Sequence, residues 1–240
     1  MTTPTIILVR PQLPENIGMA SRAMLNFGFL HLTLIAPRDE FPSPEAYSAS
    51  SGAGDIIFPK TKTFNSLEPA LKDFHYIIAT SSRKREQAIS TLTPMDSLYE
   101  ITSAMKRGDK IGVMFGPERT GLTNDDLVYA HHILEFPTNP DFPSLNLAGS
   151  VLLFCHLLFQ TTIGKDKLSQ PSFTTSAPIQ QRDYFINRLL AALEQNGFFK
   201  SPTMQPALSR NIKQMITRAN FSQQDIKTWQ GIITNLLEKK

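Results

Sequence analysis

Cysteine is nearly absent from the sequence, because Cys155 is the single one among 240 residues. No disulfide can therefore form within the chain, which excludes a disulfide-stapled secreted scaffold and favours a reducing cytoplasm. No apolar run approaches the roughly 20 residues that a membrane-spanning helix needs. Residues 1–4 lead directly into an apolar, strand-like run, so we expect no signal peptide and a cytoplasmic location.

Two motifs of common enzyme classes are also missing. No Gly-x-Gly-x-x-Gly sequence follows the first apolar run, which argues against an ordinary dinucleotide-binding domain. The neighbours His131 and His132 have no further histidine, cysteine or carboxylate at a metal-ligand spacing, so we expect no metal site. Cys155 lies within the apolar run 151–158, which predicts a buried thiol rather than a nucleophile.

Charge is unevenly placed along a chain that is otherwise typical of a globular protein, with 41% hydrophobic residues and length for one to two domains. Residues 179–240 hold nine Lys/Arg and four Asp/Glu, a net of +5. Residues 1–178 hold fifteen and seventeen, a net of −2. The tail is thus predicted to have an anionic partner, although solvated helix faces are often basic as well.

Apolar runs alternate with helix-like segments over the first two thirds of the chain. The predicted strands are 5–9, 32–36, 55–58, 76–79, 111–115 and 133–136, and the predicted helices are 16–27, one from Ser43, 66–72, 93–106 and 145–162. Ser43-Pro44 and Thr93-Pro94 are typical helix starts. This order predicts an α/β fold with a mainly parallel sheet.

The last third of the chain is predicted to be a separate helical unit. Residues 164–178 are rich in Lys, Ser, Thr and Pro and are interpreted as a linker. Three helices are expected beyond it, at 179–195, 203–218 and 222–238, of which the last two are amphipathic. The predicted division is therefore a domain at 1–163, the linker, and a helical extension at 179–240.

Three short segments carry most of the functional information. They are Asn16-x-Gly18-x-x-x-Arg22, the loop from Gly116 to Leu122, and Ser144-Leu145-Asn146. Loops at the carboxyl ends of parallel strands are where α/β folds bind ligands, so the last two could build one small-molecule pocket. Each residue also has a simpler interpretation: Asn16, Ser144 and Asn146 as helix caps, Arg22 as a surface arginine, and Glu118 as an ion-pair partner of Arg119.

Taken in this order, the segments resemble the three motifs of the SpoU branch of the SPOUT RNA methyltransferases, over about residues 5–162. Thr80-Ser81-Ser82-Arg83 and the tail sequence Thr217-Arg218-Ala219 resemble, more narrowly, the bacterial enzymes that methylate the ribose 2′-hydroxyl of nucleotide 32 in the tRNA anticodon loop. The resemblance implies a deep trefoil knot at the carboxyl end of the catalytic domain. It also implies that the Gly116 and Ser144 loops hold S-adenosylmethionine (SAM), and that a homodimer completes the site.

The resemblance also implies roles for single residues. The catalytic candidates are Arg22, Asn16, Glu118, Ser144 and Asn146. The cofactor-binding candidates are Thr80, Ser81, Ser82, Gly116, Phe136, Pro143, Ser144 and Leu145. The RNA-binding candidates, which also reflect the charge of the tail, are Arg22, Arg83, Lys84, Arg85, Lys200, Arg210, Lys213 and Arg218.

Other functions stay open at this point. The chain could be an RNA-binding module without catalysis, or a nucleotide-dependent oxidoreductase on a doubly wound sheet. It could also methylate another position of tRNA or another RNA. The sequence does not decide which base it prefers, or which group accepts the proton of the hydroxyl. The expected partners are tRNA and a second copy of the chain, with no membrane and no metal.

Overall fold

The computed structural model describes residues 3–81, 89–163 and 175–238. Its centre is a parallel sheet of seven strands in the order β3-β2-β1-β6-β4-β7-β5. The strands are β1 (Thr5–Val9), β2 (Leu32–Ile35), β3 (Lys62–Phe64), β4 (Tyr76–Thr80), β5 (Thr91–Leu92), β6 (Ile111–Phe115) and β7 (His132–Leu134). The predicted mainly parallel α/β sheet is confirmed.

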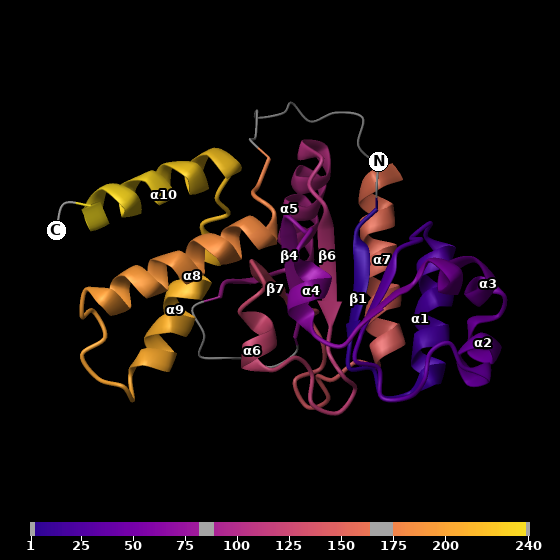
Figure 1. Ribbon diagram of the computed structural model, residues 1–240. Helices are drawn as coiled ribbons and strands as arrows, with labels where there is room; N and C mark the ends of the chain where they lie inside the picture. Colours follow the sequence, from indigo (N-terminus) through magenta and orange to yellow (C-terminus); the bar gives the residue numbers. More distant parts are fainter. Residues whose placement is uncertain (1–2, 82–88, 164–174, 239–240) are drawn as a thin grey trace.

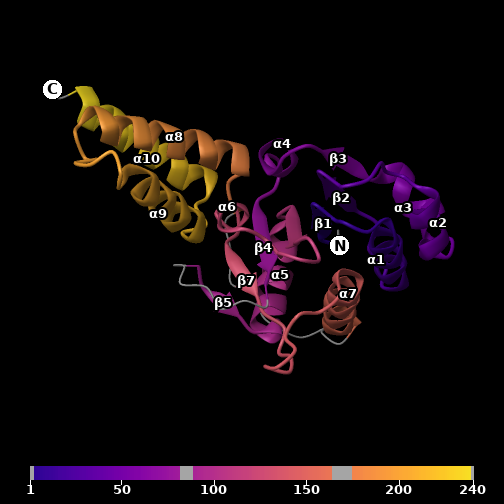
Figure 2. The same ribbon diagram turned by 90° about the horizontal axis from the view of Figure 1, so that it is seen from below.

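Helices cover both faces of this sheet (Figure 2). One face packs against α1 (Pro14–Asn26), α2 (Pro44–Ser50), α3 (Ala53–Ile57), α5 (Pro94–Arg107) and α7 (Leu147–Ile163). The other packs against α4 (Leu67–Leu71), α6 (Asn124–Leu127) and the start of α8 (Ile179–Gln195). Alternate residues of β1 point to opposite faces of the sheet. Ile6 and Leu8 belong to the apolar core on the α1 side, and Ile7 and Val9 belong to the core on the α4 side. A continuous apolar strand is what this double burial requires.

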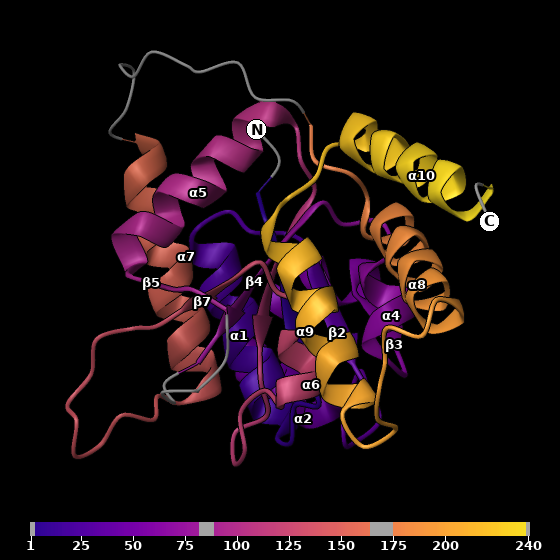
Figure 3. The same ribbon diagram turned by 90° about the vertical axis from the view of Figure 1, so that its left-hand side faces the viewer.

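The tail forms a small helical layer beside the sheet (Figures 1 and 3). Helices α8, α9 (Gln205–Arg218) and α10 (Gln223–Glu238) enclose a third apolar cluster that includes Phe185, Ile216 and Ile226. The amide of Ile179 donates to the carbonyl of Phe74 at 2.8 Å, which ties the start of α8 to the main body. The domain division stays a prediction, and most of the predicted linker lies outside the described residues.

Helix starts follow their local chemistry. Ser43 and Thr93 cap α2 and α5 as predicted, because their side chains accept hydrogen bonds from the amides of Ala46 and Asp96. Gly18 has a packing role: a Cβ there would lie 2.2 Å from the carbonyl oxygen of Ala46. Glycine at this position therefore lets α2 cross α1 closely.

Two local predictions are wrong. The predicted strand at 55–58 belongs to α3 and the 3₁₀ turn η1 (Phe58–Lys60), while the strand is the more polar β3, which lies at the sheet edge. An apolar run alone does not separate a short strand from a buried helix. Helix α1 begins at Pro14, and Leu13 rather than Asn16 is its cap residue. Proline is already set for the first helical turn, which leaves the Asn16 side chain for other contacts.

Candidate active site

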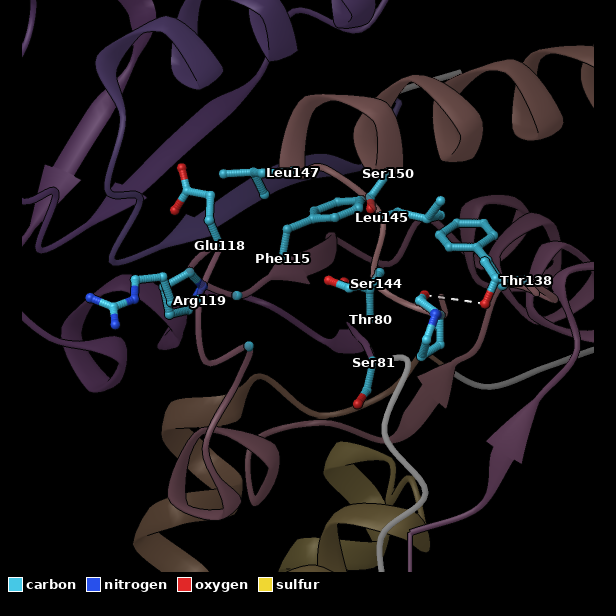
Figure 4. Close-up of a pocket in the computed structure, with 15 residues that line it drawn as sticks. Thr80, Ser81, Phe115, Glu118, Arg119, Thr138, Ser144, Leu145, Leu147 and Ser150 are labelled. Carbon is cyan, nitrogen blue, oxygen red and sulfur yellow. Dashed lines mark hydrogen bonds between the residues drawn. The ribbon is translucent and has the colours of Figure 1, made fainter. Parts of the chain in front are cut away.

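A pocket opens where β4, β6 and β7 end, next to the end of β1. These four strands are neighbours in the sheet, so their carboxyl ends meet at one edge. The loops that follow three of them, β4, β6 and β7, enclose a cavity of about 280 Å³ together with the first turn of α7 (Figure 4). Seven of the residues predicted to bind a cofactor line it: Thr80, Ser81, Gly116, Phe136, Pro143, Ser144 and Leu145. The eighth, Ser82, lies outside the described residues.

The Gly116 loop is folded back on itself with no room for a side chain. A Cβ on Gly116 would lie 2.3 Å from the amide nitrogen of Leu122 and 2.5 Å from the carbonyl carbon of Gly121. Both contacts are with backbone, which cannot move aside as a flexible side chain can. Gly121 has φ of +66°, a conformation that other residues rarely adopt. The two glycines therefore fix the wall of the pocket.

Residues from all three motif segments meet beside the pocket. The Glu118 carboxylate accepts hydrogen bonds from the amides of Gln12 and Leu13 at 2.9 and 3.2 Å, and from Asn16 Nδ2 at 2.8 Å. Asn16 Oδ1 in turn accepts from Asn146 Nδ2 at 3.1 Å. Among the described residues Glu118 forms no ion pair with Arg119, whose side chain extends away from Thr80 and Ser144 (Figure 4).

Asn146 has a second contact, because its Oδ1 accepts the amide of Gly149 at 3.2 Å in the first turn of α7. Asn146 thus has the contact expected of a helix cap and also contacts Asn16. We call Asn16, Glu118 and Asn146 the polar cluster. It joins the start of α1, the loop after β6 and the start of α7 into one fixed arrangement.

Arg22 is not part of this arrangement within one chain. Its side chain is exposed on α1, does not line the pocket, and donates from Nη1 to Ser51 Oγ at 3.1 Å. The structure therefore brings together four of the five catalytic candidates and leaves Arg22 at the surface.

An ion pair that the sequence did not predict holds the loop after β1. The guanidinium of Arg10 contacts both carboxylate oxygens of Asp126, with Nη1 to Oδ1 at 3.1 Å. Asp126 is 4% exposed and caps α6 together with Thr123. Arg10 itself has φ of +49°, an unusual conformation for arginine. The pair lies at one end of the turn whose amides hold Glu118; its partners are 116 residues apart, so no local pattern could have revealed it.

Arg10→Ala is expected to lower the free energy of unfolding by about 1–3 kcal/mol, because the buried Asp126 carboxylate loses its charged partner. Arg38→Ala is the matched control, since Arg38 forms an exposed pair with Asp39 and should change stability little. Urea unfolding monitored by circular dichroism measures both. An equal loss in the two variants would contradict a structural role of the buried pair.

Two tail cations predicted to bind RNA contact the main body. Arg210 Nη2 lies 3.2 Å from Asp125 Oδ1, and the Lys213 ammonium lies 4.4 Å from the centre of the Tyr129 ring. Lys200 and Arg218 are exposed. Arg83, Lys84 and Arg85 lie outside the described residues, so their predicted role is untouched.

His131 and Cys155 are structural. His131 is buried, accepts the amide of Ile77 at Nδ1, and has a pKa held well below its usual range by burial. Burial raises the pKa of the Cys155 thiol, which disfavours a thiolate nucleophile. In the described ranges no His/Cys/Asp/Glu group suits a metal ion, and no helix is long and apolar enough to cross a membrane.

Comparison with known proteins agrees with this geometry. The profile of the SpoU rRNA Methylase family matches residues 3–156. The chain is 30% identical to the tRNA (cytidine/uridine-2'-O-)-methyltransferase TrmJ of Photorhabdus laumondii, across 96% of this chain and 95% of that protein. A crystal structure of TrmJ from Z. mobilis ZM4 has a TM-score of 0.86 at 37% identity, across 98% of this chain and 99% of that one. The SpoU methyltransferase AviRb of Streptomyces viridochromogenes, crystallised with AdoMet, shares the fold at a TM-score of 0.53 and 15% identity, over 68% of this chain and 59% of that one.

Proposed function

The chain belongs to the SpoU rRNA methylase family, and on that premise we propose that it transfers a methyl group from SAM to a ribose 2′-hydroxyl of tRNA, at nucleotide 32 of the anticodon loop. The observation that carries the proposal is the meeting of all three motif segments at one pocket. Methylation of another tRNA or rRNA position is the alternative.

The pocket suits a molecule with both apolar and polar parts. Phe115, Phe136 and Leu145 supply apolar wall, whereas Thr80 and Ser144 supply hydroxyl groups. Its volume is close to the lower end of the roughly 300–1,000 Å³ of small-molecule sites. SAM supplies a methyl group already activated by the sulfonium charge. We therefore assign its binding to the seven described candidates, and take the Gly116 and Ser144 loops to form the trefoil knot that the family resemblance implies.

The polar cluster is proposed to hold the reacting groups in place. Asn16 and Asn146 have their amides fixed by mutual contact and by Glu118, so the junction of cofactor and ribose is pre-organised. A 2′-hydroxyl becomes a nucleophile only as its proton leaves. Arginine does not release its own proton in proteins, so Arg22 is assigned to clamp the target phosphate and to stabilise the developing alkoxide.

Arg22 can serve this role only if it reaches the methyl-transfer pocket, and it does not line that pocket in its own chain. We therefore propose that Arg22 acts at the pocket of a partner subunit. An apolar face nearby fits such a dimer: α7 has no charged residue along its 17 residues, and its Leu152 is 44% exposed. Met19 on the adjacent α1 is exposed as well.

The protein is expected to sediment as a homodimer at micromolar concentration, and Leu152→Glu is expected to make it monomeric and inactive. A carboxylate buried in an apolar interface loses its hydration and gains no charged partner, so the dimer is destabilised. Ile56→Glu is the matched control, because Ile56 is 45% exposed and lies on α3, which packs against α1 and α2, and this variant should stay dimeric. An active wild-type monomer would contradict the proposed dimer.

The tail is proposed to bind tRNA outside the anticodon loop. Replacing Lys200, Arg210, Lys213 and Arg218 together by glutamine should raise the KM for tRNA with little change in kcat. The slope of log affinity against log salt should become shallower by about 0.9 for each lost phosphate contact. Since Arg210 contacts Asp125 and Lys213 contacts Tyr129, thermal unfolding of the variant must be compared with the wild type. Unchanged affinity and unchanged slope would show that these charges only solubilise the helices.

The substrate is tested most simply in cells. Mass spectrometry of tRNA nucleosides from a strain that lacks the gene should show the loss of one 2′-O-methyl group, mapped to nucleotide 32. Loss at another nucleotide would favour the alternative, and no loss from any RNA would contradict both.

A further inference from the structure

A second, larger cavity lies at the opposite end of the sheet from the proposed methyl-transfer pocket. It has a volume of about 580 Å³ and is formed where β1, β2 and β6 begin, near the described start of the chain (Figure 1). Thr5, His31 and Ile111 are among its lining residues. None of its lining residues belongs to the pocket at the carboxyl ends of the strands. The family match does not assign a role to this cavity.

Four lysines line this cavity, and we call them the lysine cluster: Lys60, Lys62, Lys72 and Lys110. They come from four separate segments, namely the end of η1, the start of β3, the residue after α4 and the residue before β6. All four side chains are exposed. Within the described ranges, none of the four ammonium groups is paired with a carboxylate. Lys110 instead lies over the Phe74 ring, 4.7 Å from its centre.

The carboxylates of the cavity do not balance these charges. Asp73 and Asp109 are the acidic residues among its lining residues. Asp109 is buried and already paired, with Arg107 Nη2 at 2.8 Å and the amide of Ser176 at 3.3 Å. This leaves Asp73 opposite four ammonium groups. The side chains of Thr5 and Thr33 add hydroxyl groups to the wall.

We propose that this cavity binds a ligand with two or more phosphate groups. Like charges gathered around one cavity repel one another, and a multivalent anion between them removes that repulsion. Lysine is a compact point charge with three rotatable donors, which suits phosphate oxygens. Two sources share this chemistry: a free oligophosphate or nucleotide, and the phosphate backbone of the tRNA. The position of the cavity, at the far end of the sheet, makes it independent of the methyl donor.

The direct test is isothermal titration of the full-length protein with tripolyphosphate at low salt. The wild type should bind, and Lys62→Gln/Lys110→Gln should bind at least tenfold more weakly. Lys106→Gln/Lys227→Gln is the matched control, because it removes the same charge from exposed positions outside the cavity and should bind like the wild type. The temperature of thermal unfolding should be alike in the three proteins, since the substituted residues are all exposed: Lys62, Lys110, Lys106 and Lys227.

The two sources are separated by measuring tRNA affinity against salt for the same three proteins. A weaker affinity and a shallower salt slope in the cavity variant alone would assign the site to the tRNA backbone. Unchanged tRNA binding, together with tripolyphosphate binding that the cavity variant loses, would assign it to a free phosphate ligand. The proposal is overturned if cavity and control variants behave alike towards both tripolyphosphate and tRNA. Neither result depends on methyl transfer, so the proposed function is tested separately.

Discussion

Replacing Arg22 by alanine is expected to lower kcat for methyl transfer by about 100- to 1,000-fold, which is the usual effect of removing a donor to developing negative charge. SAM should bind with unchanged affinity, because Arg22 is assigned to the phosphate of the RNA and not to the cofactor. Arg22→Lys should also be strongly impaired, since lysine cannot make two parallel hydrogen bonds to one phosphate. Single-turnover kinetics with tRNA and calorimetric titration with SAM measure the two quantities.

Ser51→Ala provides the control for this experiment. It removes the described contact of Arg22 within the chain but leaves the guanidinium in place, so turnover should stay near that of the wild type. If the Arg22→Ala enzyme turned over nearly normally, the catalytic role of Arg22 would have to be abandoned. If Ser51→Ala were as damaging as Arg22→Ala, the contact with Ser51 rather than with RNA would explain the loss.

Gly116→Ala is expected to abolish SAM binding, with an affinity at least 100-fold weaker. The new methyl group would lie 2.3 Å from the amide nitrogen of Leu122, so the loop would have to open and the pocket wall would be lost. Overpacking of this kind typically lowers the free energy of unfolding by about 1–3 kcal/mol. Here the neighbouring atoms belong to the backbone, so they cannot move aside as a flexible side chain can. Gly149→Ala is the matched control, because the nearest atom to its added carbon is Asn146 Cβ at 3.9 Å. Near-normal SAM affinity of Gly116→Ala would mean that the loop does not bind the cofactor.

Mixing the Arg22→Ala and Gly116→Ala variants tests whether Arg22 acts at the partner's pocket or at the pocket of its own chain. A mixed dimer has one intact Gly116 loop on the Arg22→Ala subunit and one intact Arg22 on the Gly116→Ala subunit. If Arg22 acts at the partner's pocket, mixing should restore part of the activity. If both residues act within one chain, the mixture should stay inactive.

The elements that sequence predicts well are those with local causes. The capping serine and threonine at Ser43 and Thr93 fix helix starts, and the apolar run at β1 fixes a strand that is buried on both faces. The pocket was predictable because the carboxyl ends of neighbouring parallel strands must meet. The strand prediction at 55–58 was wrong because its apolar pattern fits a helix and a strand equally well, and no local signal decides between them.

Features that depend on distant contacts were not predictable. The Arg10–Asp126 pair joins residues from two loops, and the lysine cluster arises only because β1, β2 and β6 begin side by side. The polar cluster is an intermediate case. Its three members were chosen by resemblance to known motifs, but nothing in their spacing showed that Asn16 would bind Glu118 rather than cap its own helix.

Methyl transfer to tRNA can be measured by incubating the purified protein with SAM and an unmodified tRNA transcript, and mapping the product by mass spectrometry. We expect one added methyl group on the ribose of nucleotide 32, and none on a transcript with a 2′-deoxyribose at that nucleotide. Methyl transfer to a base, or undiminished transfer to the deoxy transcript, would contradict the proposed activity.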